Sequence, residues 1–233
     1  MPKPASIILT VMLGLYSVIT SANELVVIAA DHSTFQPGAI IKGDTILNLA
    51  QGERLTLVSS AGKTISLQGP YQGPAQMDQD QVSSAVVASL SRLLKSSNSS
   101  TVIAAFRGAS GSQSINPFAI NVSRSGTYCV LKPATLRRKK SKHEDSVSIE
   151  LLATGQRVTQ TWPVGESTLA WPQSLILKDG ARYSVKLDSA LNTTEITLQL
   201  ITADLPTDVH RAAWMGENNC EKQAREILRQ LVN

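Results

Sequence analysis

Short segments in which apolar and polar residues alternate recur along both halves of the chain. A two-residue period puts the apolar side chains on one face of an extended segment, so the pattern predicts β-strands. In the first half the segments are "TILNL", "RLTLV" and "KTISL", and turn residues separate them at Gly43-Asp44, Gln51-Gly52 and Ala61-Gly62. Strands with a turn about every ten residues predict a β-meander within residues 24–71, which is expected to close on itself or to dock against another part of the chain.

The second half contains a longer series of strand-like segments, which are "TYCVLK", "SVSIELLA", "RVTQTW", "TLAW", "SLILK", "RYSVKL" and "TEITLQLIT". Short strands with turns between them predict a β-sandwich on the immunoglobulin or fibronectin type III plan. Within "LILKDGARYSVKL", Asp179-Gly180 is the expected turn and Tyr183 begins the next strand. This arrangement resembles the tyrosine corner of such sandwiches, in which the hydroxyl bonds to nearby backbone.

Two segments have helical spacing of their apolar residues. The first lies within residues 76–95, with Asp78 or Asp80 as the cap, and its apolar stripe consists of Val82, Val86, Val87, Leu90, Leu93 and Leu94. We expect this stripe to cover the open face of the meander and not a membrane, because the polar face is rich in Ser and poor in cations. The second is a C-terminal helix that begins near Asp208, with a break expected at Gly216.

A resemblance to a known family appears in the first half. In residues 37–74, "PGAIIKGDTILNLAQGERLTLVSSAGKTISLQGPYQGP", Gly43, Gly52 and Gly62 each precede an alternating aliphatic segment, and a Gly-Pro ends the stretch. The stretch resembles the FecR-type β-domain of bacterial envelope proteins, which implies extracytoplasmic signalling or surface-associated interaction and no catalysis. The sequence does not show the transmembrane segment and anti-sigma region of complete FecR regulators, so their full regulatory function is not implied.

The first residues have the layout of a secretory signal peptide. Lys3 precedes an apolar run over residues 7–19, and the small residues Ser21 and Ala22 follow it. The run is shorter than the roughly 20 residues that span a bilayer. We therefore expect cleavage after Ala22, no transmembrane segment after cleavage, and a periplasmic or secreted protein. Retention of the segment as an N-terminal anchor is the alternative.

The chain has only two cysteines, Cys129 and Cys220, and both follow the predicted signal. In an oxidising compartment a disulfide between them is the default. It would tie the C-terminal helix to the first strand of the sandwich, where the helix would cover a sheet edge or an open end of the core. The alternative makes Cys129 a thiol nucleophile assisted by His143 or His210.

The expected fold class is mainly β: a small N-terminal β-meander domain with one helix, a linker, and an immunoglobulin-like β-sandwich with a C-terminal helix. The expected boundaries are a signal peptide over residues 1–22, a FecR-like β-domain over 23–75, the amphipathic helix over 76–95, a Ser/Gly-rich linker over 96–122, and the sandwich with its helix over 123–233.

The sequence contains few of the motifs that indicate a catalytic or metal-binding site. The three histidines, His32, His143 and His210, lie far apart and in no zinc-binding spacing, so no metal is expected. No G-x-S-x-G or phosphate-binding glycine loop is present, so neither a cofactor nor an enzymatic activity is expected. A hydrolase with dispersed acidic residues remains a third hypothesis, since two distant carboxylates can meet in space.

The tryptophans offer a candidate ligand platform. Trp162 and Trp171 each precede a proline, in "TWPVGESTLAWP". Stacked on a sugar or a Pro-rich peptide, the two rings would form a carbohydrate-binding or peptide-binding surface. Alternatively, Pro163 and Pro172 mark strand ends and push the preceding Trp into an extended conformation in which the ring points into the core.

A basic cluster is the second candidate surface. Formal net charge is only +4, but "RRKKSKH" concentrates Arg137, Arg138, Lys139, Lys140 and Lys142. The segment is expected to be a solvated loop tip or to attract an anionic surface, such as lipid headgroups or a cell-wall polymer. Nucleic acid is not expected as a partner, because few aromatic residues interleave with the cations.

These observations predict an exported bacterial envelope protein without enzymatic activity, which senses or scaffolds through contacts with an envelope protein partner. The alternative is a carbohydrate-binding module for cell-wall or other glycans, which requires that Trp162 and Trp171 are exposed.

Overall fold

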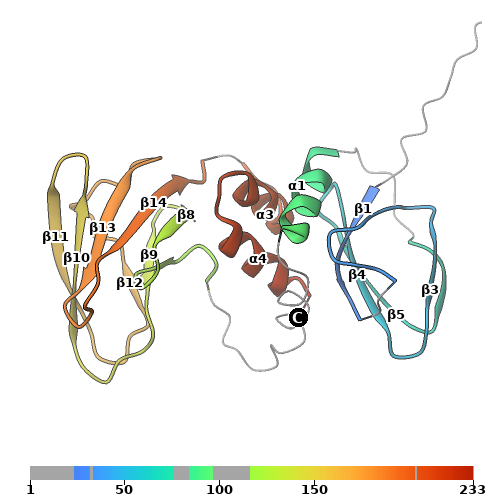
Figure 1. The fold of residues 1–233 in the computed structure, drawn as a ribbon, viewed down its shortest axis with the longest axis horizontal. Helices are drawn as coiled ribbons and strands as arrows, with labels where there is room; N and C mark the ends of the chain where they lie inside the picture. The colour runs from blue at the N-terminus through green and yellow to red at the C-terminus, as the bar shows by residue number, and fades with distance from the viewer. Residues whose placement is uncertain (1–23, 32–33, 76–83, 97–115, 203, 233) are drawn as a thin grey trace, which may run out of the picture.

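The computed structural model describes residues 24–31, 34–75, 84–96, 116–202 and 204–232. The predicted signal peptide, the predicted helix caps before residue 84 and most of the predicted linker lie outside the described residues. Within them the fold is mainly β, as predicted, and a layer of helices lies between two β-rich units (Figure 1).

The N-terminal unit is built from β1 (Glu24–Ala30), β2 (Ile40–Lys42), β3 (Ile46–Leu49), β4 (Arg54–Ser59), β5 (Thr64–Gln68) and β6 (Tyr71–Pro74). One sheet has the order β2-β1-β4-β5, and β3 pairs with β6 in a second sheet. The three segments predicted as strands are β3, β4 and β5. Their pairing differs from a simple meander, because β1 lies between β2 and β4, and β3 pairs with β6 instead of β4.

Strand β1 explains this difference. Four consecutive apolar residues, 25–28, are buried in it, so both of its faces need cover. Leu25 and Val27 pack in a core shared with β3 and β4, whereas Val26 and Ile28 pack in a core shared with the helices. A continuous apolar run is typical of a strand buried on both faces.

The helical layer consists of α1 (Ser84–Lys95), α3 (Asp208–Glu217) and α4 (Glu221–Gln230), as Figure 1 shows. Helix α1 covers β1 as predicted, because Val87, Leu90 and Leu94 share one core with Val26 and Ile28. The C-terminal helices complete the same core from the other side of α1, through residues that include Val209, Ala212, Met215, Ala224, Ile227 and Leu228.

The expected break in the C-terminal helix is present, but it lies two residues after Gly216. Gly216 lies inside α3, and the chain turns instead at Asn218 and Asn219, where Asn219 takes a φ of 62°. A Cβ added to Gly216 would lie 3.7 Å from the Leu93 side chain of α1. A side chain here would thus meet α1 at ordinary van der Waals distance, so the contact between the two helices does not require the glycine.

The C-terminal unit is a sandwich of β7 (Ile120–Asn121), β8 (Gly126–Val130), β9 (Thr135–Arg137), β10 (Asp145–Leu151), β11 (Gln156–Trp162), β12 (Thr168–Ala170), β13 (Arg182–Leu187) and β14 (Thr194–Leu200). One sheet has the order β11-β10-β13-β14-β8 and the other the order β12-β9-β7. Apolar residues from both sheets form one core between them. The two-layer sandwich agrees with the predicted architecture.

Four details of the sandwich differ from the prediction. The segment "SLILK", residues 174–178, begins in a turn and continues without regular structure instead of forming a strand, and the short strands β7 and β9 were not predicted. The expected linker also ends earlier, because Ala119, Ile120 and Val122 are buried in or beside the sandwich core. Finally, β8 pairs in parallel with β14, which comes about 70 residues later in the chain.

The junction between the helices and the sandwich lies at β8. Cys129 of β8 and Cys220, just before α4, form the predicted disulfide. The side-chain amide of Gln223 bonds the same strand residue twice: Cys129 N donates to Gln223 Oε1 at 2.7 Å, and Gln223 Nε2 donates to Cys129 O at 3.0 Å. Gln223 Nε2 also donates to Pro117 O at 2.8 Å. The amide thus satisfies the free edge of β8 as a neighbouring strand would.

This geometry predicts that Gln223→Leu lowers the free energy of unfolding by about 2 to 4 kcal/mol, because buried backbone groups lose their partners while the disulfide stays closed. Urea unfolding under non-reducing conditions measures it. Lys222→Leu, at the exposed neighbouring position, is the matched control and should change stability by less than about 0.5 kcal/mol. Equal effects of the two substitutions would contradict the capping role.

Candidate functional site

Both tryptophans of the predicted ligand platform are buried. The exposed fraction is 0% for Trp162 and 6% for Trp171, and both rings belong to the sandwich core. Trp162 Nε1 donates to Glu166 O at 3.1 Å, and Trp171 Nε1 donates to Leu175 O at 2.9 Å. The platform expectation is therefore wrong, since the rings offer no open face and their only donors are engaged inside the fold.

The tyrosine corner has the predicted geometry. Tyr183 Oη donates to Ile176 O at 2.7 Å and accepts a hydrogen bond from Lys178 N at 3.0 Å. Its ring meets Trp171 edge to face, with ring centroids 5.1 Å apart. Burial raises the pKa of Tyr183, and the Lys178 N–H opposes this rise only in part. The hydroxyl therefore stays protonated and holds the irregular segment that replaces the predicted strand "SLILK".

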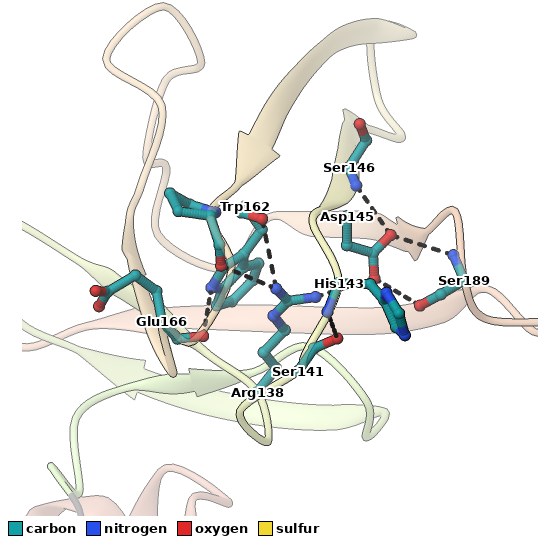
Figure 2. A network of polar contacts seen from close by, with 9 residues as sticks. Arg138, Ser141, His143, Asp145, Ser146, Trp162, Glu166 and Ser189 are labelled. Atoms are coloured by element: carbon teal, nitrogen blue, oxygen red, sulfur yellow. Dashed lines mark hydrogen bonds and ion pairs between the residues drawn. The ribbon is translucent and has the colours of Figure 1, made fainter.

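The basic segment does not present all five of its cations. Arg138 turns inward, as Figure 2 shows, and its side chain is 4% exposed. Arg138 Nη1 lies 3.0 Å from Asp145 Oδ2, and Nη2 donates to Trp162 O at 3.4 Å and Pro163 O at 3.3 Å. The guanidinium carbon lies 4.8 Å from the centre of the Trp162 ring, within cation–π range. Arg138 is therefore wrongly assigned to an anion-binding patch.

Asp145 is the centre of this polar network. Its side chain is 5% exposed, and Oδ1 accepts hydrogen bonds from Ser146 N at 2.9 Å and Ser189 N at 3.2 Å. Oδ2 accepts a hydrogen bond from Ser189 Oγ in addition to the one from Arg138. Burial raises the pKa of the carboxyl, but the hydrogen bonds from Ser189 and Ser146 and the charge of Arg138 outweigh it, so the pKa lies below its ordinary value.

The network joins three loops at one end of the sandwich, which we call the loop end: residues 138–144, 163–167 and 188–193. Arg138 bonds the start of the second loop, and Asp145 bonds Ser189 of the third. Backbone bonds reinforce the first two, because Gly165 N donates to Ser141 O and Arg138 N donates to Ser167 O, both at 2.9 Å. These contacts hold three adjacent loops in one arrangement.

The loop end carries exposed side chains of two kinds. Lys139, Lys140 and Lys142 are exposed, and none of them forms an ion pair with the described residues. Leu191 is fully exposed at 100%, and Val164 is exposed as well. Arg137, in contrast, lies half-buried in β9. Three of the five predicted cations therefore remain available, beside two exposed apolar side chains.

The Ser, His and Asp side chains at the loop end are not linked in the way that a catalytic triad requires. Ser141, His143 and Asp145 lie near one another in Figure 2, but the bond that joins the first two runs from His143 N to Ser141 Oγ, at 3.1 Å, and not from the imidazole ring. The Asp145 carboxylate is occupied by Arg138 and Ser189. Cys129 is not a free thiol. Among the described residues, no three His, Cys, Asp or Glu side chains are grouped to hold a metal ion.

Comparison of the chain with protein-family models, curated proteins and solved structures finds no match. The resemblance of residues 37–74 to the FecR-type β-domain therefore stays a prediction. In the part of the chain that is described, no helix is long and apolar enough to cross a membrane.

Sequence reasoning missed the roles of Asp145 and Ser189. In the sequence Asp145 is one of two acidic residues that follow the cationic run, and the pattern "DSALNT" around Ser189 carries no signal beyond a turn. The available clue was the acidic residue that follows the cationic run, since a buried Arg requires a partner. Which of five adjacent cations faces inward does not follow from their order in the chain.

The buried pair predicts that Arg138→Met lowers the free energy of unfolding by about 3 kcal/mol, because it leaves the Asp145 carboxylate buried without its cation. Arg137→Met is the matched control, and its cost should stay below about 1 kcal/mol because Arg137 forms no ion pair with the described residues. Urea unfolding followed by tryptophan fluorescence measures both. Equal costs would contradict the inward role of Arg138.

The lowered pKa of Asp145 predicts a pH-dependent contribution to stability. A depressed folded-state pKa contributes stability above the unfolded value of about 3.9, and this contribution is lost as pH falls through the folded-state pKa. The difference in unfolding free energy between the wild type and Asp145→Asn should therefore be largest near neutral pH and shrink below about pH 4. A difference that is constant with pH would contradict the assignment.

Proposed function

We propose that this protein is an exported bacterial envelope protein without enzymatic activity, which senses or scaffolds by binding a protein partner at the loop end of its sandwich. The observation that carries the proposal is the Arg138–Asp145 network. It holds three loops together and leaves Lys139, Lys140, Lys142 and Leu191 exposed on them. Loops positioned by a rigid sandwich are a common place for binding residues.

Export is supported by the covalent structure. The disulfide between Cys129 and Cys220 is buried in the core that joins the helices and β8. Disulfides of this structural kind persist in oxidising compartments. The signal-peptide layout of residues 1–22 supports the same compartment, in either the periplasm or the extracellular space.

A scaffolding role is supported by the arrangement of the two β-rich units. Each has its own apolar core, and a third core, formed by the helices together with β1, β4 and Cys129, connects them. Figure 1 shows the helices between the units and the sandwich at one end of the molecule. The loop end can then contact a partner while the N-terminal unit, which resembles a FecR-type β-domain, contacts another component.

The chemistry of the loop end suits a protein partner with an acidic, partly apolar surface. Isolated lysines would suffice for a polyanion, but an interface with a protein also needs apolar contact, which Leu191 and Val164 supply. The lysines would steer the approach of the acidic surface, and their contribution would fall as the salt concentration rises. The glycan alternative required Trp162 and Trp171 to be exposed, and both are buried.

Site-specific crosslinking in living cells tests this proposal. A photoreactive amino acid at Leu191 should give a discrete protein adduct in the envelope fraction. The matched control replaces Leu152, an exposed leucine in the turn between β10 and β11 at the opposite end of the sandwich, and should give no such adduct. Substitution of Lys139, Lys140 and Lys142 by Ala should reduce the Leu191 adduct at least several-fold.

Two results would refute the proposal. Equal adducts from positions 191 and 152 would show that the contact is unspecific. An adduct with lipid or cell-wall polymer in place of protein would assign the three lysines to an anionic surface instead.

A further inference from the structure

The two edges of the five-stranded sheet of the sandwich differ in a way that the proposed function does not explain. At one edge, β8 is covered by the Gln223 amide and the disulfide to Cys220. At the other edge, β11 pairs only with β10 among the described residues, and it forms the outer side of the sandwich in Figure 1. A sheet edge without a neighbour presents unpaired N–H and C=O groups.

Strand β11 lacks the features that usually protect a free edge. It has seven residues, "QRVTQTW", in full register with β10, without a bulge, Gly or Pro. Val158, Thr159 and Thr161 favour extended structure. Its one charged residue, Arg157, is already paired with Glu150 of β10. Natural edge strands are usually shorter, interrupted, or carry free charges that repel another strand.

We propose that β11 pairs antiparallel with β11 of a second copy of this chain, about a two-fold axis at Thr159, so that the two five-stranded sheets join into one. Side chains 158, 160 and 162 point towards the core, and 157, 159 and 161 point to solvent. Both copies must keep their cores on the same side of the joined sheet. An odd-numbered residue must therefore face an odd-numbered residue of the second copy, and an even-numbered residue an even-numbered one. This holds only when the two-fold axis passes through a residue position and not between two residues.

A register centred on Thr159 pairs the whole strand. Thr159 then faces Thr159 of the second copy, and Arg157 faces Thr161 of the second copy. No like charges are opposed, and threonine pairs across strands are favourable. An acidic or basic segment of another protein would gain no charge complementarity, because β11 carries no unpaired charge. Self-pairing, in contrast, provides backbone partners along the full length of the edge.

Gln160 adds a second observation at the same edge. Its Oε1 atom is buried and has no hydrogen-bond partner among the described residues. In the register centred on Thr159, Gln160 faces Val158 of the second copy, and the two Gln160 side chains occupy diagonal positions. Long side chains reach one another across such diagonals. After a side-chain rotation, one Gln160 amide can therefore donate to the other and satisfy this acceptor.

Pairing of single edge strands buries little surface compared with the roughly 1,200 Å² of a standard protein interface, so the dimer should be weak. Sedimentation velocity at protein concentrations from about 10 to 500 µM tests whether the purified protein self-associates. We expect the sedimentation coefficient to rise with concentration. A monomer over the whole range would overturn the proposal.

Charge variants at the axis test the register. Thr159→Lys and Thr159→Glu each place two like charges opposite one another, so each variant alone should stay monomeric. An equimolar mixture should associate again, because Lys then faces Glu across the axis. Thr159 is exposed, so neither change should disturb the fold, which circular dichroism checks. Self-association that is unchanged in either variant would overturn the proposal.

A cysteine variant tests the distance between the copies. Thr159→Cys should form an intermolecular disulfide under mild oxidation, because directly opposite Cβ atoms lie about 5 Å apart. Ser148→Cys is the matched control: it lies on the same sheet face, beside Thr159 but one strand further from the edge, and should not crosslink. Crosslinking at both positions, or at neither, would count against a two-fold axis at Thr159. The loop end takes no part in these tests, so their outcome is independent of the proposed function.

Discussion

The architecture depends on the contact between α4 and β8. Cys220 and Gln223 stand three positions apart, and both reach Cys129, one through a covalent bond and the other through two hydrogen bonds to its backbone. A strand edge and a helix start have unpaired backbone groups that are costly to bury. The Gln223 amide removes that cost on the strand side. Cys129 can therefore be buried in the core of the helical layer although its strand belongs to the sandwich.

The loop end shows a second use of buried polar groups. A buried ion pair contributes little net stability compared with apolar residues of the same size, because both charges lose their hydration. The ion pair and its hydrogen bonds, however, form only in a restricted geometry. Asp145 accepts bonds from Arg138 and Ser189, and Arg138 also donates to Pro163 O, so these bonds can form together only when all three loops adopt one arrangement. The pair is thus better understood as a determinant of loop conformation than as a source of stability.

Much of the fold was predictable from local pattern. The strands β3, β4, β5, β10, β11, β13 and β14 all contain segments that alternate apolar and polar residues, and α1 has a clear apolar stripe. The missed strands β7 and β9 have only two and three residues, too few for a period to be visible. "SLILK" has the composition of a strand, but the hydrogen bonds of Tyr183 hold it in an irregular conformation.

The candidate site was less predictable, because its key property is orientation. Trp162 and Trp171 are recognisable as anchors in the sequence, but the side to which their rings point depends on the strand pairing across the sandwich. Arg138 looks the same as its cationic neighbours until Asp145 and the Trp162 ring are brought beside it. The contacting residues are separated from Arg138 by 7 and 24 positions in the sequence. Local periodicity of apolar residues cannot predict contacts over such separations.

The sequence by itself determined the β-rich class, the amphipathic helix and the disulfide, because each depends on side-chain periodicity or on there being only two cysteines. Only the tertiary structure decided that β1 lies between β2 and β4, that β8 is capped by Gln223, and that β11 has no strand beyond it among the described residues. Periodicity determines which side chains share a face. The segment that covers that face or edge is selected by the packing of the whole chain, in which distant segments compete to bury apolar surface and to pair backbone groups.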